Sequence, residues 1–354
     1  MLFKRSPNVI IPILITLVFS FMPFAFLVYA AVCPDDPESA RVAFATIAQR
    51  RGTILALSLR TLGYAIVAGL TAFLIGVIPG AILATFSIRA KRVAVGCFAA
   101  AFTFPDVWHA GAWLQWLGGI RIGSGMDAFR PFEIRISQGW FPAAGLLAGL
   151  WLAPLAAWLA LIVLARNRAD DGSYRDAARL FTTPARAFFY VTINASRRPL
   201  AGIGLLLMAL ATGALAATDL LGVRVFSEEI FVCLNTPSMF PAAAGLSIIP
   251  SVIAATLLLI ALYLIQPVFA TDAKPAGSQA ALYQTETRWG NVALHTIVFL
   301  IALFYIALPL SSVFISAYSN ESHSLKHVLS HADVALQSVK TSLMIGLSSG
   351  ALAA

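Results

Sequence analysis

Long apolar runs, separated by short polar segments, repeat along the chain. About 20 apolar residues are the length that a helix needs to cross the hydrocarbon core of a bilayer. About seven complete runs occur, at about 8–31, 58–86, 94–117, 139–165, 199–220, 241–265 and 290–314, and a further run begins near Ser338. The pattern predicts an all-α integral membrane protein. Because the last run stops at Ala354, short of a full span, we expect a truncated chain.

The composition agrees with this class. Hydrophobic residues make up 59% of the chain and charged residues 11%, and the mean hydropathy is +0.84. Soluble domains carry roughly 25% charged residues. The first apolar run is longer than the core of a secretory signal peptide, which spans about 7–15 residues, so we expect a retained first span. Cys33, Cys97 and Cys233 show no metal-ligand spacing.

The basic residues predict the orientation of the chain in the membrane. With the N-terminus in the cytoplasm, the cytoplasmic segments carry most of the Lys and Arg, and acidic residues slightly outnumber basic ones outside. This distribution follows the positive-inside rule. The net charge of +8 and the pI of about 9.7 are therefore a sign of topology and do not indicate nucleic-acid binding.

The polar stretch Arg166–Pro199 lies between two apolar runs and, in this orientation, faces the cytoplasm. Its pattern predicts two short amphipathic helices, the first over about Ser173–Phe181. Thr182 or Thr183 is placed to cap the second helix, with Pro184 at its first position, where a missing N–H costs least. The apolar face of the second helix carries Ala185, Phe188, Phe189 and Ile193. Such a helix pair is suited to dock into the groove of a cytoplasmic partner.

The polar segment 266–289 has no helix signals and predicts a cytoplasmic linker between two units. The chain after it repeats features of the N-terminal part. Asn291-Val292 opens an apolar run as Asn8-Val9 does, and Ser338-Val339-Lys340-Thr341 resembles Ser58-Leu59-Arg60-Thr61. These matches occur in the same order, so they predict a duplication with a first unit over 1–265 and a truncated second unit over 290–354.

Three ionisable residues within or beside the apolar runs are candidate pathway residues. Asp106 and His109 fall inside one run, where ionisable groups are costly and often functional. The alternative is that they reach headgroups or water at the interface. Asp219 is the third candidate, at the outer end of another run, and a plain solvated loop is its alternative.

Several motifs of enzymes and metal sites are absent. No Gly-x-x-x-x-Gly-Lys-Ser/Thr loop occurs, so the chain lacks this cradle for ATP phosphates. No Gly-x-Ser-x-Gly elbow or His-Glu-x-x-His motif occurs either, and nothing indicates catalysis or a cofactor. His323, His327 and His331 are spaced to share one helix face, but no carboxylate or Cys accompanies them there. We therefore expect a solvated helix and no metal.

The stretch 166–199 resembles the cytoplasmic Glu-Ala-Ala loop of binding-protein-dependent ABC importer permeases. Asp176-Ala177-Ala178 stands for Glu-Ala-Ala, and Val191-Thr192-Ile193 stands for the later Ile-x-Leu. Asp replaces Glu, Thr182 stands where Gly is expected, Asn194 replaces the final Pro, and the interval is one residue short. The residues that the resemblance implies for coupling to an ATPase are Asp176, Ala177, Ala178, Arg179, Thr182, Thr183, Pro184, Arg186, Phe188 and Ile193.

The resemblance covers about Leu55–Ile265 and resumes near Ser324. The run Ala217–Val223, followed by Glu228-Glu229-Ile230, is similar to fused two-unit permeases of the ferric-iron and thiamine type. The resemblance implies the transmembrane domain of a type I ABC importer. This fold would comprise a six-helix permease unit with its coupling loop at 166–199, followed by the start of a second unit.

The resemblance also implies a function, that of a permease subunit in the bacterial inner membrane. Separate cytoplasmic ABC ATPase subunits, expected as a dimer, would hydrolyse ATP, and an external solute-binding protein would deliver ferric iron, thiamine or another small solute. One alternative is an ion-coupled secondary transporter, although the sequence has no string of buried charges. The other is a non-transporting or decayed permease-like protein.

Overall fold

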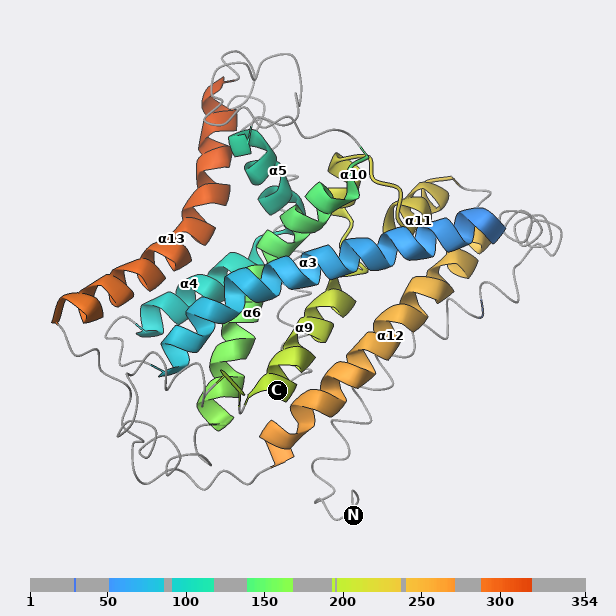
Figure 1. The fold of residues 1–354 in the computed structure, drawn as a ribbon. Helices are drawn as coiled ribbons and strands as arrows, with labels where there is room; N and C mark the ends of the chain where they lie inside the picture. The colour runs from blue at the N-terminus through green and yellow to red at the C-terminus, as the bar shows by residue number, and fades with distance from the viewer. Residues whose placement is uncertain are drawn as a thin grey trace.

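The computed structural model describes residues 51–85, 91–117, 139–167, 196–236, 240–270 and 288–319, together with Tyr29, Ile193 and Asn194. Within these residues the chain is helical apart from short turns and contains no strand (Figure 1). The expected all-α class is therefore confirmed for the described part of the chain.

The described helices vary widely in length. Their bounds are α3 (Arg51–Thr85), α4 (Lys91–Thr103), α5 (Asp106–Leu117), α6 (Phe141–Asn167), α9 (Arg197–Ala211), α10 (Ala216–Leu220), α11 (Phe226–Leu234), α12 (Phe240–Ala270) and α13 (Arg288–Ser319). Three of them, α3, α6 and α12, are long and apolar enough to cross a membrane, and the bent pair α4–α5 would make a fourth span. This is the architecture of a membrane protein. The runs predicted at 8–31 and from Ser338 lie outside the described residues.

The helices α3 and α6 form the closest pair in the bundle, because small residues line their contact. A Cβ atom at Gly76 would collide with the Ala153 carbonyl oxygen, and one at Gly80 with the Ala157 carbonyl oxygen. A Cβ atom at Gly149 would likewise collide with the Ala68 carbonyl oxygen. Small residues let membrane helices approach until their backbones touch, which increases the van der Waals contact between them. The α3 helix continues through Pro79 without a break.

Contacts between these helices also fix their relative directions. The order of the contacts makes α3 and α6 parallel, and α9 antiparallel to α3, since Gly69 meets Met208 while Gly204 meets Phe73. Gly202 packs against Ile265, which makes α12 antiparallel to α9 when taken with the order of the chain (Figure 1). The three long helices α3, α6 and α12 therefore run in the same direction, and α9, which lies between α6 and α12 in the chain, runs opposite to them.

Two of the predicted continuous spans are wrong in detail, because the structure interrupts both of them. The span at 94–117 is divided between α4 and α5, which meet at Phe104 and Pro105 with a bend of 97°. Proline has no N–H and disfavours a helical conformation in the residue before it. The span at 199–220 is divided between α9 and α10 by the turn 212–215, which contains Gly213.

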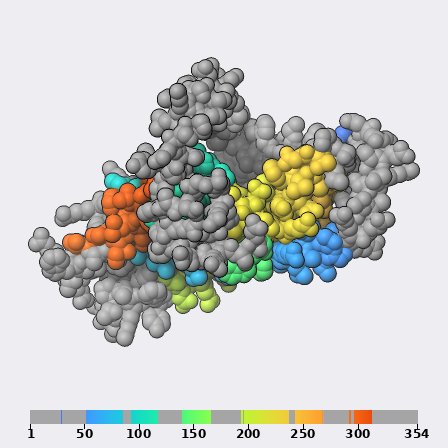
Figure 2. Space-filling model, turned by 90° about the horizontal axis from the view of Figure 1, so that it is seen from above, coloured from blue at the N-terminus to red at the C-terminus, as the bar shows by residue number. Residues whose placement is uncertain are grey.

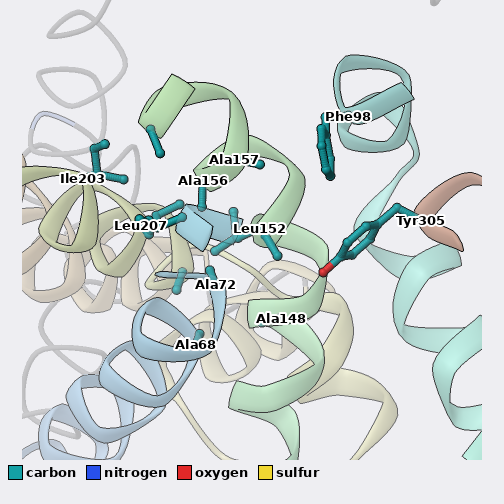
Figure 3. Packing of buried hydrophobic residues seen from close by; sticks show 14 of the residues in the cluster. Ala68, Ala72, Phe98, Ala148, Leu152, Ala156, Ala157, Ile203, Leu207 and Tyr305 are labelled. Atoms are coloured by element: carbon teal, nitrogen blue, oxygen red, sulfur yellow. The ribbon is translucent and has the colours of Figure 1, made fainter. Parts of the chain in front are cut away.

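The helix α13 packs against the other helices of the bundle. Its residues Val298, Ala302 and Tyr305 belong to the same hydrophobic core as the buried residues of α3, α6 and α9. Figure 3 shows Tyr305 reaching from α13 with its hydroxyl end toward α6, close to Phe98 of α4. Of the predicted linker 266–289, residues 266–270 are the last turn of α12, and 271–287 lie outside the described residues.

A smaller hydrophobic core lies where α11 meets the first turns of α3 and α12. It contains Leu57 of α3, Phe226 and Cys233 of α11, and Ala243 and Leu246 of α12. Thr61 of α3 accepts a hydrogen bond of 3.1 Å from the Phe226 backbone N–H. Figure 2 shows the α11 region, in yellow, beside the start of α3, in blue. The short helix α11 is thereby tied to the ends of two long helices.

Candidate functional site

The interruption between α4 and α5 exposes backbone groups that a continuous helix would pair. The Phe104 carbonyl oxygen accepts a hydrogen bond of 3.1 Å from the Trp151 indole N–H of α6. The Pro105 carbonyl accepts hydrogen bonds from the backbone N–H groups of Trp108 and His109, at 3.0 and 3.3 Å, which start the new helix. Irregular backbone at membrane depth is stable only where protein or water pairs such groups.

The interruption between α9 and α10 is stabilised in a similar way. The Ala214 carbonyl oxygen accepts hydrogen bonds from the Tyr64 hydroxyl of α3, at 3.3 Å, and from the Ser227 hydroxyl, at 3.4 Å. The hydroxyl of Thr212 donates back to the Ala209 carbonyl at 2.7 Å. Tyr64 is fully buried, so its hydroxyl reaches this turn through the packed interior of the bundle.

The two interruptions meet at one place. The Asp106 carboxylate, on the first residue of α5, accepts a hydrogen bond of 3.4 Å from the backbone N–H of Ala216, the first residue of α10. A carboxylate is stabilised at the start of a helix, where backbone N–H groups are unpaired and the helix dipole is positive. We call residues 104–106 and 212–216, with this contact between them, the break junction.

A narrow crevice with no space for a water molecule opens beside the break junction. The residues that line it come from α5, α6 and the α9–α10 region: Asp106, Ala110, Leu147, Ala148, Trp151, Ala214 and Ala217. Four of these are alanines, so the helices lie close together, and Asp106 supplies the single charge among them. The ring of Trp151 stacks on Phe102 of α4 with a centroid separation of 5.5 Å, which holds the indole in position for its hydrogen bond.

The adjacent side of α5 faces α13 and is lined by aromatic rings. His109 is fully buried, and its ring lies 6.4 Å from the rings of both Phe104 and Tyr305. One turn further on, the Trp113 ring makes an edge contact with Phe304 at 5.5 Å. The Ala101 backbone lies near the His109 ring, but neither nitrogen of His109, nor the indole nitrogen of Trp113, makes a hydrogen bond of good geometry with any described residue.

The three candidate pathway residues thus lie in different surroundings. Asp106 and His109 occupy consecutive turns of one short helix at the break junction, which the structure brings into the interior of the bundle. Asp219, on α10, has an exposed side chain. Burial raises the pKa of the Glu228 carboxyl of α11, the charge of Glu229 raises it further, Arg224 opposes the shift, and Asp219 adds a smaller increase.

Most of the residues predicted for ATPase coupling lie outside the described residues. They are Asp176, Ala177, Ala178, Arg179, Thr182, Thr183, Pro184, Arg186 and Phe188, and the His323, His327 and His331 positions lie outside as well. Their roles stay predictions. Ile193 is described, and its half-buried side chain packs against the hydrophobic core.

Sequence reasoning missed the residues that stabilise the break junction. Pro105, a proline in the middle of an apolar run, indicates an interrupted span. Trp151 is a tryptophan far from either end of its run, which is unusual for an interfacial anchor. Tyr64 and Tyr305 gave weaker signals, because a tyrosine in an apolar helix does not identify the group that its hydroxyl or ring contacts.

No family model matches the chain, and no curated protein matches it either. Interrupted helices that meet inside a helical bundle are characteristic of membrane transporters, because the break provides polar backbone and a point of movement at membrane depth.

Proposed function

We propose that the chain is the permease subunit of an ATP-driven ABC importer and that the break junction is part of its translocation pathway. The observation that carries the proposal is the hydrogen bond between Asp106 and Ala216, which joins two interrupted helices inside the bundle. Transporters of several folds build their solute sites from such discontinuous helices. The resemblance of the loop 166–199 to the coupling loop of these permeases supports the ATP-driven class.

The connectivity offers a path from the coupling loop to the break junction. The loop 166–199 leaves the end of α6 and enters the start of α9. Trp151 of α6 holds the Phe104 carbonyl, and Ala214 follows the end of α9. A displacement of the loop by an ATPase would therefore be transmitted to both interruptions through two rigid helices. Access to the pathway would change because packed helices shift between discrete arrangements rather than deform continuously.

The remaining parts of the proposal rest on the orientation expected from the basic residues and on the family resemblance of the loop 166–199. The N-terminus and the loop 166–199 face the cytoplasm of a bacterial inner membrane, where the ATPase subunits, expected as a dimer, bind. The α10–α11 region faces outward and receives the solute-binding protein. The solute is ferric iron, thiamine or another small molecule. The described chain from 288 onward begins a second permease unit.

The coupling loop provides the test. The chain is tagged in its native host, purified in mild detergent, and assayed for vanadate-sensitive ATP hydrolysis by the associated subunits. Ala178→Asp and Phe188→Asp are expected to remove this activity while leaving the amount of inserted chain unchanged, because each places a charge on an apolar docking face. Ala169→Asp makes the same change outside the predicted helices and should behave as wild type. Full ATPase activity in all three variants would exclude docking through this loop.

A second candidate, an ion-coupled secondary transporter, is favoured by one observation. Asp106 places a carboxylate at an interrupted helix next to the crevice, which is a common arrangement for proton or sodium coupling. Reconstituted chain would then transport solute with an ion gradient and without any ATPase. Transport that depends on ATP and persists after the gradient is collapsed would exclude this candidate.

A further inference from the structure

The contact between α5 and α13, which we call the α5–α13 seam, combines aromatic ring contacts with unpaired polar atoms. It consists of His109, Trp113 and Trp116 on α5 and of Phe304, Tyr305 and Ser311 on α13. The Trp116 indole N–H donates a hydrogen bond of 3.1 Å to the Ser311 hydroxyl. The other two side chains that α5 contributes to the seam, His109 and Trp113, have buried nitrogens without hydrogen-bond partners among the described residues.

Unpaired polar atoms are unfavourable in a permanently closed contact. Burying a donor or acceptor without a partner is destabilising, and most buried polar side chains are paired. Here the unpaired nitrogens belong to residues four apart, so they lie on one face of α5. Two unpaired polar groups on the same face of α5 favour a binding site that is closed in this structure. When the site opens, these nitrogens would form hydrogen bonds with a ligand.

The helix α13 is suited to act as the cover of this site. Its rings Tyr305 and Phe304 each contact one of the two unpaired side chains. The side chain of Phe304 is 49% exposed, so the outer edge of the cover lies at the surface of the described bundle. A modest separation of α13 from α5 would expose His109 and Trp113 without disturbing the close α3–α6 pair.

We propose that the α5–α13 seam is a closed solute-binding site, in which His109 and Trp113 bind a solute that carries hydroxyl or carbonyl oxygens and no negative charge. This inference rests on the proposed transport function and narrows its substrate class. The indole N–H is a donor only, so the solute must present an acceptor, whereas His109 can donate or accept. The Asp106 carboxylate, one turn before His109 on α5, disfavours an anionic solute.

The test measures the reactivity of single cysteines in the full-length chain, reconstituted in liposomes after Cys33, Cys97 and Cys233 are replaced by Ala. The probes are a cationic aminoethyl and an anionic sulfonatoethyl methanethiosulfonate. Rates are normalised to those of a small thiol in solution.

Trp113→Cys is expected to react several-fold faster with the cationic probe than with the anionic one. Adding Asp106→Asn should reduce this preference. His109→Cys, a smaller change in side-chain volume, serves as a second reporter of the same site.

The control is Leu114→Cys. Leu114 is as completely buried as His109 but lies about 100° further around α5 than Trp113, within the main hydrophobic core. It should stay unreactive. If Trp113→Cys and His109→Cys are as unreactive as Leu114→Cys, the seam does not open and the inference is wrong. A preference for the anionic probe would overturn the assigned solute class.

The outcome for the seam can be separated from the outcome for the proposed function. Cysteine reactivity is measured on the chain alone and does not require an ATPase. Reactive seam cysteines in a chain that supports no ATP-driven transport would support the binding site and exclude the importer. Unreactive seam cysteines in a chain that does support ATP-driven transport would exclude the site and leave the importer in place.

Discussion

The Asp106 carboxylate lies 3.4 Å from the Ala216 backbone nitrogen, and this contact joins the first residues of α5 and α10 across 110 positions of sequence. Each of these helices begins directly after an interruption. The contact therefore fixes the two interruptions relative to one another.

Removal of the Asp106 side chain should loosen the break junction. Asp106→Ala leaves the Ala216 N–H without its acceptor, and an unpaired buried donor costs about 1–3 kcal/mol. We expect a lower thermal midpoint in detergent and faster hydrogen exchange in α10. Asp106→Asn retains an acceptor oxygen and should have a smaller effect. Equal loss of stability in both variants would show that the charge, and not the hydrogen bond, matters at this position.

Trp151→Phe isolates the hydrogen bond to the Phe104 carbonyl. The phenyl ring can still stack on Phe102, but it offers no donor, so the carbonyl at the interruption loses its 3.1 Å partner. We expect a loss of about 1–3 kcal/mol, seen as increased hydrogen exchange in α4 and α5. Trp158→Phe is the matched control, because Trp158 lies on the same helix with 42% of its side chain exposed. The control should leave exchange in α4 and α5 unchanged.

Gly76→Ala should weaken the contact between α3 and α6. The added methyl group meets the Ala153 carbonyl oxygen, which belongs to the backbone and cannot rotate away. Overpacking of this kind typically costs about 1–3 kcal/mol. Gly96→Ala adds the same group to α4, where no atom lies within 4 Å, and alanine favours a helix by about 1 kcal/mol. The thermal midpoint should therefore be lower than that of the wild type for Gly76→Ala and higher for Gly96→Ala, so that the two variants differ by several degrees.

The pKa of Glu228 predicts a dependence of stability on pH. Burial, followed by the charge of Glu229, raises the pKa of this carboxyl in the folded chain. The folded state then binds a proton more tightly than the unfolded state, so its stability falls as pH rises from the ordinary glutamate pKa through the raised one. Glu228→Gln cannot ionise and should flatten this part of the profile. The measurement is the thermal midpoint of both proteins from acidic to neutral pH.

Most of the helices are predictable from the sequence, because an apolar run near 20 residues long has few alternatives to a membrane helix. The runs at 58–86, 139–165 and 241–265 correspond to α3, α6 and α12. The same criterion failed at 94–117 and 199–220, since hydropathy averaged over a run does not detect a local break. Pro105 carried that information for the first of these runs.

Candidate site residues were only partly predictable. Asp106 and His109 stand out as ionisable residues inside an apolar run; His109 is fully buried, and Asp106 is half-buried beside the crevice. Asp219 has the same chemical character and lies on an exposed surface instead. Sequence alone does not separate these cases, because burial depends on which helices pack over a residue.

The helical membrane class, the approximate positions of the spans and the ionisable residues within them can all be read from the amino-acid sequence. These properties depend on local hydrophobicity and on chain length. By contrast, the meeting of two interruptions at Asp106 and Ala216, and the packing of α13 over His109 and Trp113, depend on how the helices are arranged in three dimensions. The hydrogen bonds that stabilise these interruptions join residues 47, 110 and 150 positions apart. A local pattern specifies that a break exists, whereas the partner of each freed backbone group is fixed by packing between distant helices.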